Sequence, residues 1–292
     1  MKPAPFEYFA PTTIDEALVR LGEYGYEAKV LAGGQSLIPM MNFRLAQPSV
    51  IIDLNKVNDL FYILPNDDGG LRIGAMTRHN QVEHHPLVAE KAPLINEAMP
   101  NIATVQVRSR GTFGGSIAHA DPSAELAAVS VALEGSFLLR NLQGERWVPA
   151  EEFFIGLFTS ALEPDELLIE AQIPPIPERT GFALVELARR PHDFALVGVA
   201  VQVTLDNADR CKNARIVFLS VGDGPVLAAQ AGEMLKNQAL TRETMRAAAE
   251  TAAKLDIEPG SDIHASAEYR RHLAGVLAFR ALEKAYARAQ AK

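Results

Sequence analysis

Cysteine is almost absent from this chain of 292 residues, and its scarcity excludes two kinds of protein. The single cysteine, Cys211, has no second cysteine with which to form an intrachain disulfide, so a disulfide-stapled secreted scaffold is excluded. An iron–sulfur cluster needs several thiolate ligands, so this chain cannot hold one by itself.

Long hydrophobic runs are also missing. No stretch of about 18 or more apolar residues occurs, so no transmembrane helix is expected. The segment from Met1 to Phe9 contains Lys2 and no apolar run, which is unlike a signal peptide. We therefore expect a cytoplasmic protein.

The chain has no excess of positive charge. Its formal net charge is −8, which argues against nucleic acid or an anionic membrane as the main partner. An acidic protein that binds a diphosphate has to do so with local donors, because its overall field repels anions. The ordinary share of hydrophobic residues, 48%, is enough to build a buried core.

Several common functional motifs are missing as well. No G-x-G-x-x-G follows a strand and no Gly-Lys dipeptide occurs, which argues against a Rossmann site and a P-loop. The seven histidines show no metal-ligand spacing, and no G-x-S-x-G supports a nucleophilic serine. We predict no metal site and no catalytic residue in this chain.

What the sequence does contain is two separate glycine pairs. The first glycine segment directly follows a predicted strand at 28–32. Glycines let a ligand approach the backbone closely, and consecutive amides can form an anion-binding nest. A plain tight turn explains the same pattern about equally well. The segment consists of Leu31, Ala32, Gly33, Gly34, Gln35, Ser36, Leu37 and Ile38.

The second glycine segment, 111–116, lies close to Arg108 and Arg110, is predicted to be irregular, and begins a loop that runs to Glu125. Its Gly-Gly pair again offers backbone amides at close range. Downstream, Asp121 and Glu125 are suited to accept hydrogen bonds from the hydroxyls of a ribityl or ribose group. A helix capped by Ser123 accounts for the same residues and is compatible with ligand contact. Two glycine segments together suggest a large, diphosphate-containing ligand held from two sides.

The order of predicted elements indicates three units, 1–56, 57–177 and 178–292. Thr13 and Glu16 form a capping-box signature that predicts a helix in the first unit. The proline run at 174–177 is the clearest boundary. Strands followed by helices in the last unit indicate an α+β layer. The other expected strands are 50–54, 70–74, 136–140, 167–173, 182–187, 196–205 and 215–221, and the other expected helical regions are 77–99, 123–133, 228–236, 242–255 and 267–289.

Four short motifs follow one another along the chain. They are A-G-G-Q-S at 32–36, G-T-F-G-G-S at 111–116, A-D-P at 120–122 and A-R-R-P-H-D-F-A at 188–195. In this order they resemble the FAD-binding medium subunit of the xanthine-dehydrogenase-like molybdenum hydroxylases, of the aerobic carbon monoxide dehydrogenase type. The resemblance runs from Phe6 to the last helix. It implies a p-cresol-methylhydroxylase-type FAD-binding fold of two α/β subdomains, followed by a C-terminal three-stranded sheet with helices.

The resemblance also implies roles for individual residues. The first glycine segment would wrap the FAD diphosphate, and Glu125 would contact the cofactor's sugar. The backbone at Leu168 would meet the adenine end or the ring system, and the Phe194 ring would shield one flavin face. Phe194 is otherwise explained as an ordinary core aromatic at the start of a strand. Besides the first segment, the implied FAD contacts are Ile102, Gly111, Thr112, Gly114, Gly115, Ser116, Asp121, Glu125, Leu168, Asp193 and Phe194.

Three residues depart from the family pattern. Phe113 stands where relatives often have Ile or Val, and Ser116 replaces a longer Asn. Glu186 stands where relatives often carry Lys, which reverses a charge near the cofactor. Covalent attachment of FAD usually needs His, Cys or Tyr beside the ring, and His119 is the one candidate, so non-covalent FAD is expected.

The resemblance implies an electron-transfer function. A large partner subunit would hold the molybdenum cofactor and a small one two [2Fe-2S] clusters, in a dimer of heterotrimers. Electrons would enter this chain's FAD and leave to an external acceptor, while the large subunit selects the substrate. Two alternatives stay open: a free-standing FAD oxidoreductase of the same fold, and a non-catalytic FAD- or nucleotide-binding assembly module.

Overall fold

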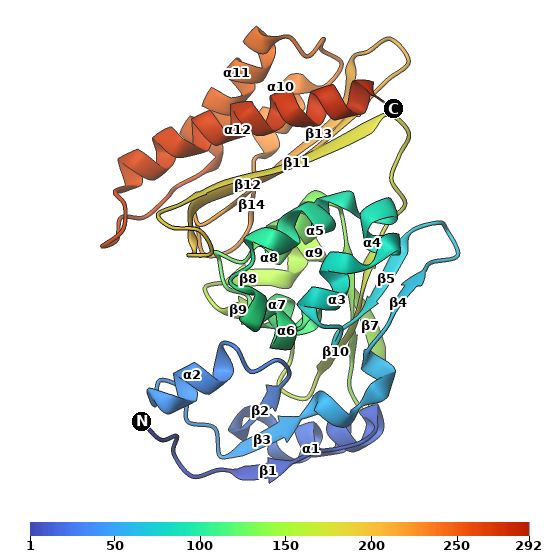
Figure 1. Cartoon of the computed structure of the whole chain (residues 1–292), viewed down its shortest axis with the longest axis vertical. Helices are drawn as coiled ribbons and strands as arrows, with labels where there is room; N and C mark the ends of the chain where they lie inside the picture. The colour runs from blue at the N-terminus through green and yellow to red at the C-terminus, as the bar shows by residue number, and fades with distance from the viewer. Residues whose placement is uncertain (292) are drawn as a thin grey trace.

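A computed structural model, which describes residues 1–291, shows three layers along the long axis of the molecule (Figure 1). Each layer is built around its own sheet, and the chain passes through the layers in order (Figure 1). This arrangement confirms the expected combination of α/β units with a C-terminal α+β unit.

The first layer is a three-stranded parallel sheet in the order β1-β3-β2. Helix α1 packs Ala17, Leu18 and Leu21 against it, because these positions share one face of the helix. The Thr13 hydroxyl accepts the Glu16 amide, as the capping signature predicted. The elements are β1 (Glu7–Phe9), α1 (Ile14–Tyr24), β2 (Ala28–Leu31), α2 (Leu37–Asn42) and β3 (Val50–Asp53).

The second layer is a five-stranded antiparallel sheet in the order β4-β5-β10-β6-β7. Short helices cover one face and form the main core with it, and the other face packs partly on the first layer. The elements are β4 (Ile63–Pro65), β5 (Leu71–Gly74), α3 (His79–His84), α4 (Pro86–Lys91), α5 (Pro93–Ala98), α6 (Val105–Arg110), α7 (Phe113–His119), α8 (Glu125–Ala132), β6 (Ser136–Arg140), β7 (Glu145–Pro149), α9 (Ala150–Phe153) and β10 (Leu167–Ile173), with the β8 (Phe154–Gly156) and β9 (Thr159–Ser160) hairpin beside them.

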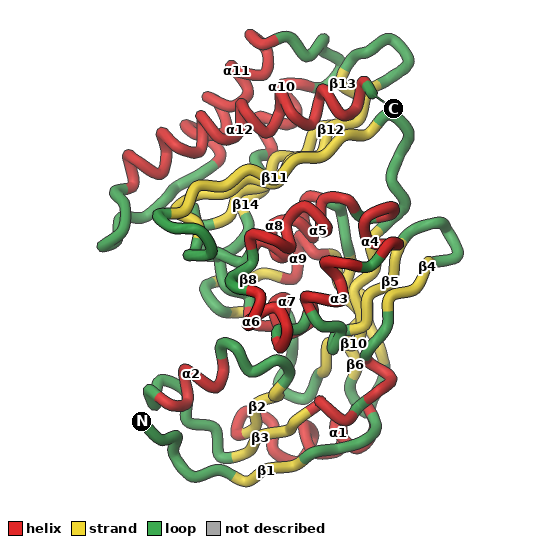
Figure 2. The backbone as a smooth tube through the Cα atoms, in the orientation of Figure 1, coloured by secondary structure: helices red, strands yellow, loops and turns green. Residues whose placement is uncertain are grey.

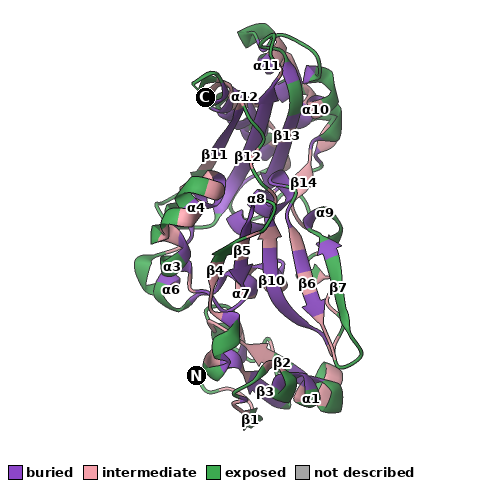
Figure 3. Cartoon of the chain, turned by 90° about the vertical axis from the view of Figure 1, so that its right-hand side faces the viewer, coloured by how far each residue is buried: buried purple, intermediate pink, exposed green. Residues whose placement is uncertain are grey.

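The third layer is an antiparallel sheet in the order β11-β12-β13-β14. One face packs on the second layer, and the other is covered by the C-terminal helices, with α12 lying along β11 and β12. Burial on both faces explains why all of β12 is buried (Figure 3). The elements are β11 (Thr180–Ala188), β12 (Ala195–Leu205), β13 (Cys211–Leu219), β14 (Val226–Leu227), α10 (Ala229–Leu235), α11 (Arg242–Thr251) and α12 (Ala267–Gln290).

The structure corrects two predictions about local structure. The second glycine segment is not irregular, because residues from Phe113 onward form helix α7 (Figure 2). Helix α8 is not capped by Ser123: its N-cap position is Ala124, and the Ser123 hydroxyl instead accepts a hydrogen bond from the Ser220 hydroxyl at 2.9 Å.

The sequence analysis also missed several short strands. These are β1, β4, β7, β8, β9 and β14, none longer than five residues. The expected three long C-terminal strands are present, and the two-residue β14 extends their sheet by one strand.

No helix within residues 1–291 is long and apolar enough to cross a membrane.

Candidate cofactor site

The first glycine segment is an open loop between β2 and α2. Gly34 has a φ of +72°, a left-handed conformation that glycine adopts without strain. Within residues 1–291, the backbone amides of Gly33, Gly34, Gln35 and Ser36 donate no hydrogen bond to a protein acceptor. Gln35 turns its side-chain amide back to the Gly33 carbonyl at 3.1 Å. The loop therefore presents a row of free donors, as an anion-binding nest requires.

The second glycine segment has five of its six backbone amides engaged within the protein, those of Gly111 and of Phe113 to Ser116. Thr112 is the N-cap of α7, and its hydroxyl accepts the Gly115 amide at 3.1 Å. The Phe113 and Gly114 amides bond the carbonyls of Thr77 and Ala75, and the Ser116 amide bonds the Thr112 carbonyl. The expectation of a second row of available amides is therefore wrong.

Close packing explains Gly114 of α7 and Gly111, which lies just before the helix. A Cβ on Gly114 would lie 2.5 Å from the Cβ of Ala75, so α7 approaches β5 only because no side chain is present there. At Gly111, a Cβ would lie 2.8 Å from Nδ1 of the buried His79. These glycines let the segment approach its neighbours, and they fix its place beside the first segment.

The two glycine segments touch each other. A Cβ on Gly33 would lie 2.5 Å from the Arg110 carbonyl and 2.7 Å from Cα of Gly111. A Cβ on Gly115 would lie 3.4 Å from the Cβ of Ala32. The sequence reasoning that brought these segments to one site is thus supported by direct contact between them.

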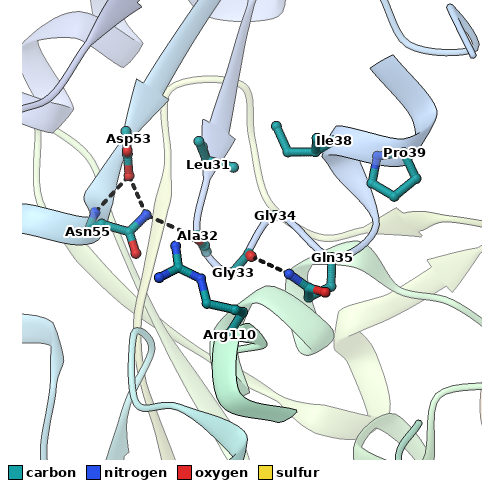
Figure 4. Close-up of a pocket in the computed structure, with 10 residues that line it drawn as sticks. All are labelled: Leu31, Ala32, Gly33, Gly34, Gln35, Ile38, Pro39, Asp53, Asn55 and Arg110. Atoms are coloured by element: carbon teal, nitrogen blue, oxygen red, sulfur yellow. Dashed lines mark hydrogen bonds between the residues drawn. The ribbon is translucent and has the colours of Figure 1, made fainter. Parts of the chain in front are cut away.

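A cavity of about 380 Å³ opens at this junction (Figure 4). Most of the first segment, from Leu31 to Gln35, forms one side, and Ile38 and Pro39 of α2 continue it. Asp53 and Asn55, at the end of β3 and just beyond it, and Arg110, at the end of α6, complete the lining. Ser36 and Leu37 belong to the same loop and helix start but do not line the cavity.

Several lining or neighbouring residues had no role in the sequence prediction, among them Asn55, Arg78 and Arg110. Asn55 donates its side-chain amide to the Ala32 carbonyl at 3.0 Å. Arg78 donates to the Asn55 side-chain oxygen and to the Arg110 carbonyl, so it connects the two segments. The signal for Arg110 was its place directly before Gly111. Asn55 and Arg78 lie outside every glycine motif and gave no such signal.

Arg108, the other arginine near the second segment, has a structural role. It is buried and pairs with Glu83 at 2.8 Å, and it also donates to the carbonyls of Ile102 and Ala103. Ile102 is buried in the core of the second layer, with its carbonyl already engaged. Leu168 lies in the same core, on β10 where the pairing with β6 shifts register. Neither side chain reaches the cavity lining.

Acidic residues form a second group, between the second and third layers. Glu125 begins α8 and is 9% exposed. Burial, followed by repulsion from Glu186 on β11, raises the pKa of Glu125 to about 8. Burial raises the pKa of Glu186 to about 7, and one of its carboxylate oxygens is buried without a partner. Asp121 accepts the Ser123 amide at 2.8 Å, so one of its oxygens is engaged.

Asp193 and Phe194 lie in the turn between β11 and β12, and neither lines the cavity at the glycine junction. This turn is on the same side of the molecule as α2 and the β8–β9 hairpin (Figure 1). The Phe194 ring is 73% exposed, so it is not a core aromatic. His119 is engaged elsewhere: its ring packs on Phe158 with centroids 5.1 Å apart, and burial lowers its pKa.

The donor set fits a dinucleotide. Free amides from Gly33 to Ser36 and the Arg110 guanidinium supply donors for a diphosphate. Leu31 and Ile38 supply apolar surface beside them, and the missing Cβ atoms at the junction allow close approach. No group of three His, Cys, Asp or Glu side chains in the described part of the chain is arranged to hold a metal ion.

Comparison with known proteins identifies the family to which this dinucleotide site belongs. Residues 4–176 match the family model described as the FAD binding domain in molybdopterin dehydrogenase. Residues 182–285 match the CO dehydrogenase flavoprotein C-terminal domain. The chain belongs to this flavoprotein family. FAD is accordingly its cofactor, and it is a subunit of a multi-subunit molybdenum-dependent oxidoreductase.

Relatives of full length support the same assignment. The chain is 38% identical to the 6-hydroxypseudooxynicotine dehydrogenase complex subunit alpha of Paenarthrobacter nicotinovorans, covering 99% of this chain and 97% of the relative. It is 39% identical to the carbon monoxide dehydrogenase medium chain of Hydrogenophaga pseudoflava, covering 99% of each. A solved structure of carbon monoxide dehydrogenase from that organism, lacking the Mo-pyranopterin moiety, matches with a TM-score of 0.95 at 40% identity over 99% of each chain.

Proposed function

We propose that this flavoprotein is the electron-exit subunit of its complex. Electrons released from substrate at a molybdenum cofactor in a large partner subunit pass through two [2Fe-2S] clusters of a small subunit to FAD here, and then to an external acceptor. When bound, FAD supplies the redox chemistry. The chain's own residues hold and orient it. The observation that carries this proposal is the row of free amides from Gly33 to Gln35 in the lining of the cavity, which Arg110 also lines.

The two segments contribute differently to binding in this proposal. The first supplies backbone donors to the diphosphate, while the second supplies a closely packed surface and the free Ser116 hydroxyl. The protonated Glu125 carboxyl offers a hydrogen-bond donor as well as an acceptor to a sugar hydroxyl. Phe194 is exposed and available to cover a flavin face. Attachment is non-covalent, because the ring of His119 is packed against Phe158.

We further propose the units and the assembly. Residues 1–56 and 57–177 form the two FAD-binding subdomains, and 178–292 form the C-terminal domain. Two copies each of the large, medium and small subunits form a heterohexamer, a dimer of heterotrimers. A cytoplasmic location fits a chain whose one cysteine is a buried free thiol. Sedimentation of the purified complex tests the stoichiometry, and cell fractionation tests the location.

A visible spectrum of the purified chain, before and after denaturation, is the first test. Flavin bands whose pigment is released as free FAD on unfolding are expected. Mixing with a reduced iron–sulfur partner should then bleach those bands. A colourless chain that takes up no added FAD would contradict the proposal.

Two other outcomes would favour a different function for this chain. Turnover of a small organic substrate by the isolated chain would support a free-standing oxidoreductase. A bound flavin that no donor reduces would support an assembly module without redox function.

A further inference from the structure

The cavity at the junction of the two glycine segments contains one cation without a partner. Among its lining residues the charged ones are Asp53 and Arg110. Within residues 1–291, the Arg110 guanidinium makes no hydrogen bond or ion pair. Figure 4 shows it extending from the end of α6 toward Ala32 and Asn55.

Asp53 does not neutralise this cation. One of its carboxylate oxygens accepts the Tyr8 hydroxyl at 2.6 Å, and the other accepts the backbone amide of Asn55 at 2.9 Å together with the Asn55 side-chain amide. The anion nearest to Arg110 in the cavity is therefore committed to neutral donors, and the guanidinium is left for a ligand.

The backbone of Arg110 is held by a separate chain of contacts. Arg78 donates to the Arg110 carbonyl and to the Asn55 side-chain oxygen, and Asn55 in turn donates to the Ala32 carbonyl. This relay joins the second segment to the first through three side-chain hydrogen bonds. Arg78 is about half-buried, and burial followed by repulsion from Arg110 lowers its pKa. Two like charges are thus kept close together, and the two hydrogen bonds that Arg78 donates hold its guanidinium in place.

We propose that Arg110 is the side-chain ligand for the diphosphate of the dinucleotide, and that Arg78 is a positioning residue that acts through Asn55. This inference rests on the proposed function, because it assigns residues to the same cofactor site. Arg110 complements the free amides of the first segment with a planar donor pair, the geometry that suits phosphate oxygens. Arg78 touches no cofactor and sets the spacing of the segments.

Affinity for FAD and for ADP, measured on the full chain stripped of cofactor, tests the role of Arg110. We expect Arg110→Gln to weaken both ligands by about ten- to a hundredfold, the effect of a lost charged hydrogen bond. Arg110→Lys should recover part of this loss, since lysine keeps the positive charge but lacks the planar pair of donors of a guanidinium. Raising the salt concentration should weaken wild-type binding more than that of Arg110→Gln, because salt screens an exposed ion pair.

The positioning residue gives a different pattern. Arg78→Gln and Asn55→Ala should each weaken FAD binding with the wild-type salt dependence retained, and the double variant should lose no more than the larger single loss, because both break one relay. Arg140→Gln is the matched control. Arg140 also connects the first two layers, pairing with Asp15 of α1 at 2.7 Å, but it touches neither glycine segment. Its FAD affinity should stay at the wild-type value.

Each outcome decides one of the two claims. Wild-type affinity in Arg110→Gln, or an affinity loss with unchanged salt dependence, would overturn the role of Arg110. Additive losses in the double variant would overturn the relay. A wild-type chain that binds ADP through Arg110 but not FAD would retain this inference and remove the proposed function. A chain that binds neither would remove both.

Discussion

The two glycine segments share a Gly-Gly pair followed by small polar residues, yet they have opposite local structures. The first is a loop whose amides from Gly33 to Ser36 are free, and the second is a helix whose first amides are all engaged. In the first segment, glycine leaves the backbone open to a ligand. In the second, it allows neighbouring elements to pack closely. A glycine pair therefore predicts close approach, and what approaches is decided by the neighbouring elements.

The substitution with the largest expected effect tests whether a glycine of α7 serves packing and not ligand binding. Gly114→Ala places a methyl group 2.5 Å from the Ala75 Cβ inside a buried contact, and should lower the free energy of unfolding by about 2–3 kcal/mol. Denaturant unfolding measures it. Gly144→Ala, at a turn with nothing within 4 Å of the new methyl, is the control and should be nearly neutral. Equal losses in both variants would contradict the packing role of the α7 glycines.

At the first segment the same substitution should affect the ligand more than the fold. Gly33→Ala meets the Arg110 carbonyl and pushes the half-buried loop away from the second segment. We expect FAD affinity to fall by about tenfold or more, with a smaller loss of stability than in Gly114→Ala. Flavin fluorescence on titration measures the affinity. An unchanged affinity would mean that contact between the segments does not shape the site.

The N-cap of α7 should have a smaller effect. Thr112→Val keeps the side-chain volume and removes the acceptor of the Gly115 amide, so a stability loss of about 1 kcal/mol is expected. Thr13→Val removes the equivalent cap from α1, where the hydroxyl accepts the Glu16 amide at 3.2 Å. Thermal unfolding should report similar losses for both, while FAD affinity should fall in Thr112→Val alone. An equal fall of FAD affinity in Thr13→Val would show that the α7 cap has no specific role at the cofactor site.

The carboxyl groups of Glu125 and Glu186 should make the stability of the protein depend on pH. Near the first segment Asp53 has donors, whereas Glu125 and Glu186 are buried with raised pKa values of about 8 and about 7. The folded state therefore binds more protons than the unfolded state above the ordinary glutamate pKa. Stability should fall as pH rises from about 5 to 8, because that is the range between ordinary and raised values.

Glu186→Gln should flatten that slope. The variant should unfold like the wild type at about pH 5 and be more stable than it at about pH 8, as measured by urea unfolding across the range. Glu258→Gln, at an exposed position, should leave the slope unchanged. A wild-type slope in Glu186→Gln would show that this carboxyl is not the titrating group.

Elements with local signals could be predicted from the sequence. The Thr13 cap fixed the start of α1, and the long apolar runs of β12 and β13 fixed the third sheet. Helix α7 was missed because glycines disfavour helices, and its stability comes from Thr112 and from packing on Ala75, which is distant in sequence. The Ser123 cap was wrong because Ser220, almost a hundred residues later, engages its hydroxyl.

The candidate site could likewise be predicted only where a local sequence pattern marks it. The motifs identified both glycine segments, and the structure brings them into contact. Arg78 and Asn55 were missed because their role depends on contacts between residues far apart in the sequence, which no local pattern records. Ile102 and Leu168 came from the family resemblance, and their side chains lie in the core. Their contact with FAD stays a prediction, as does that of Phe194.

The position of α12 in the sequence, after the strands that it covers, has a consequence for biosynthesis. Its 24 residues cover β11 and β12, and its last turn pairs with the second layer through Arg288 and Glu97. A ribosome makes this helix about 60 residues after the end of β12, so the apolar surface that α12 covers stays open during that interval. Until α12 has been made and has packed, a nascent copy exposes this surface to aggregation.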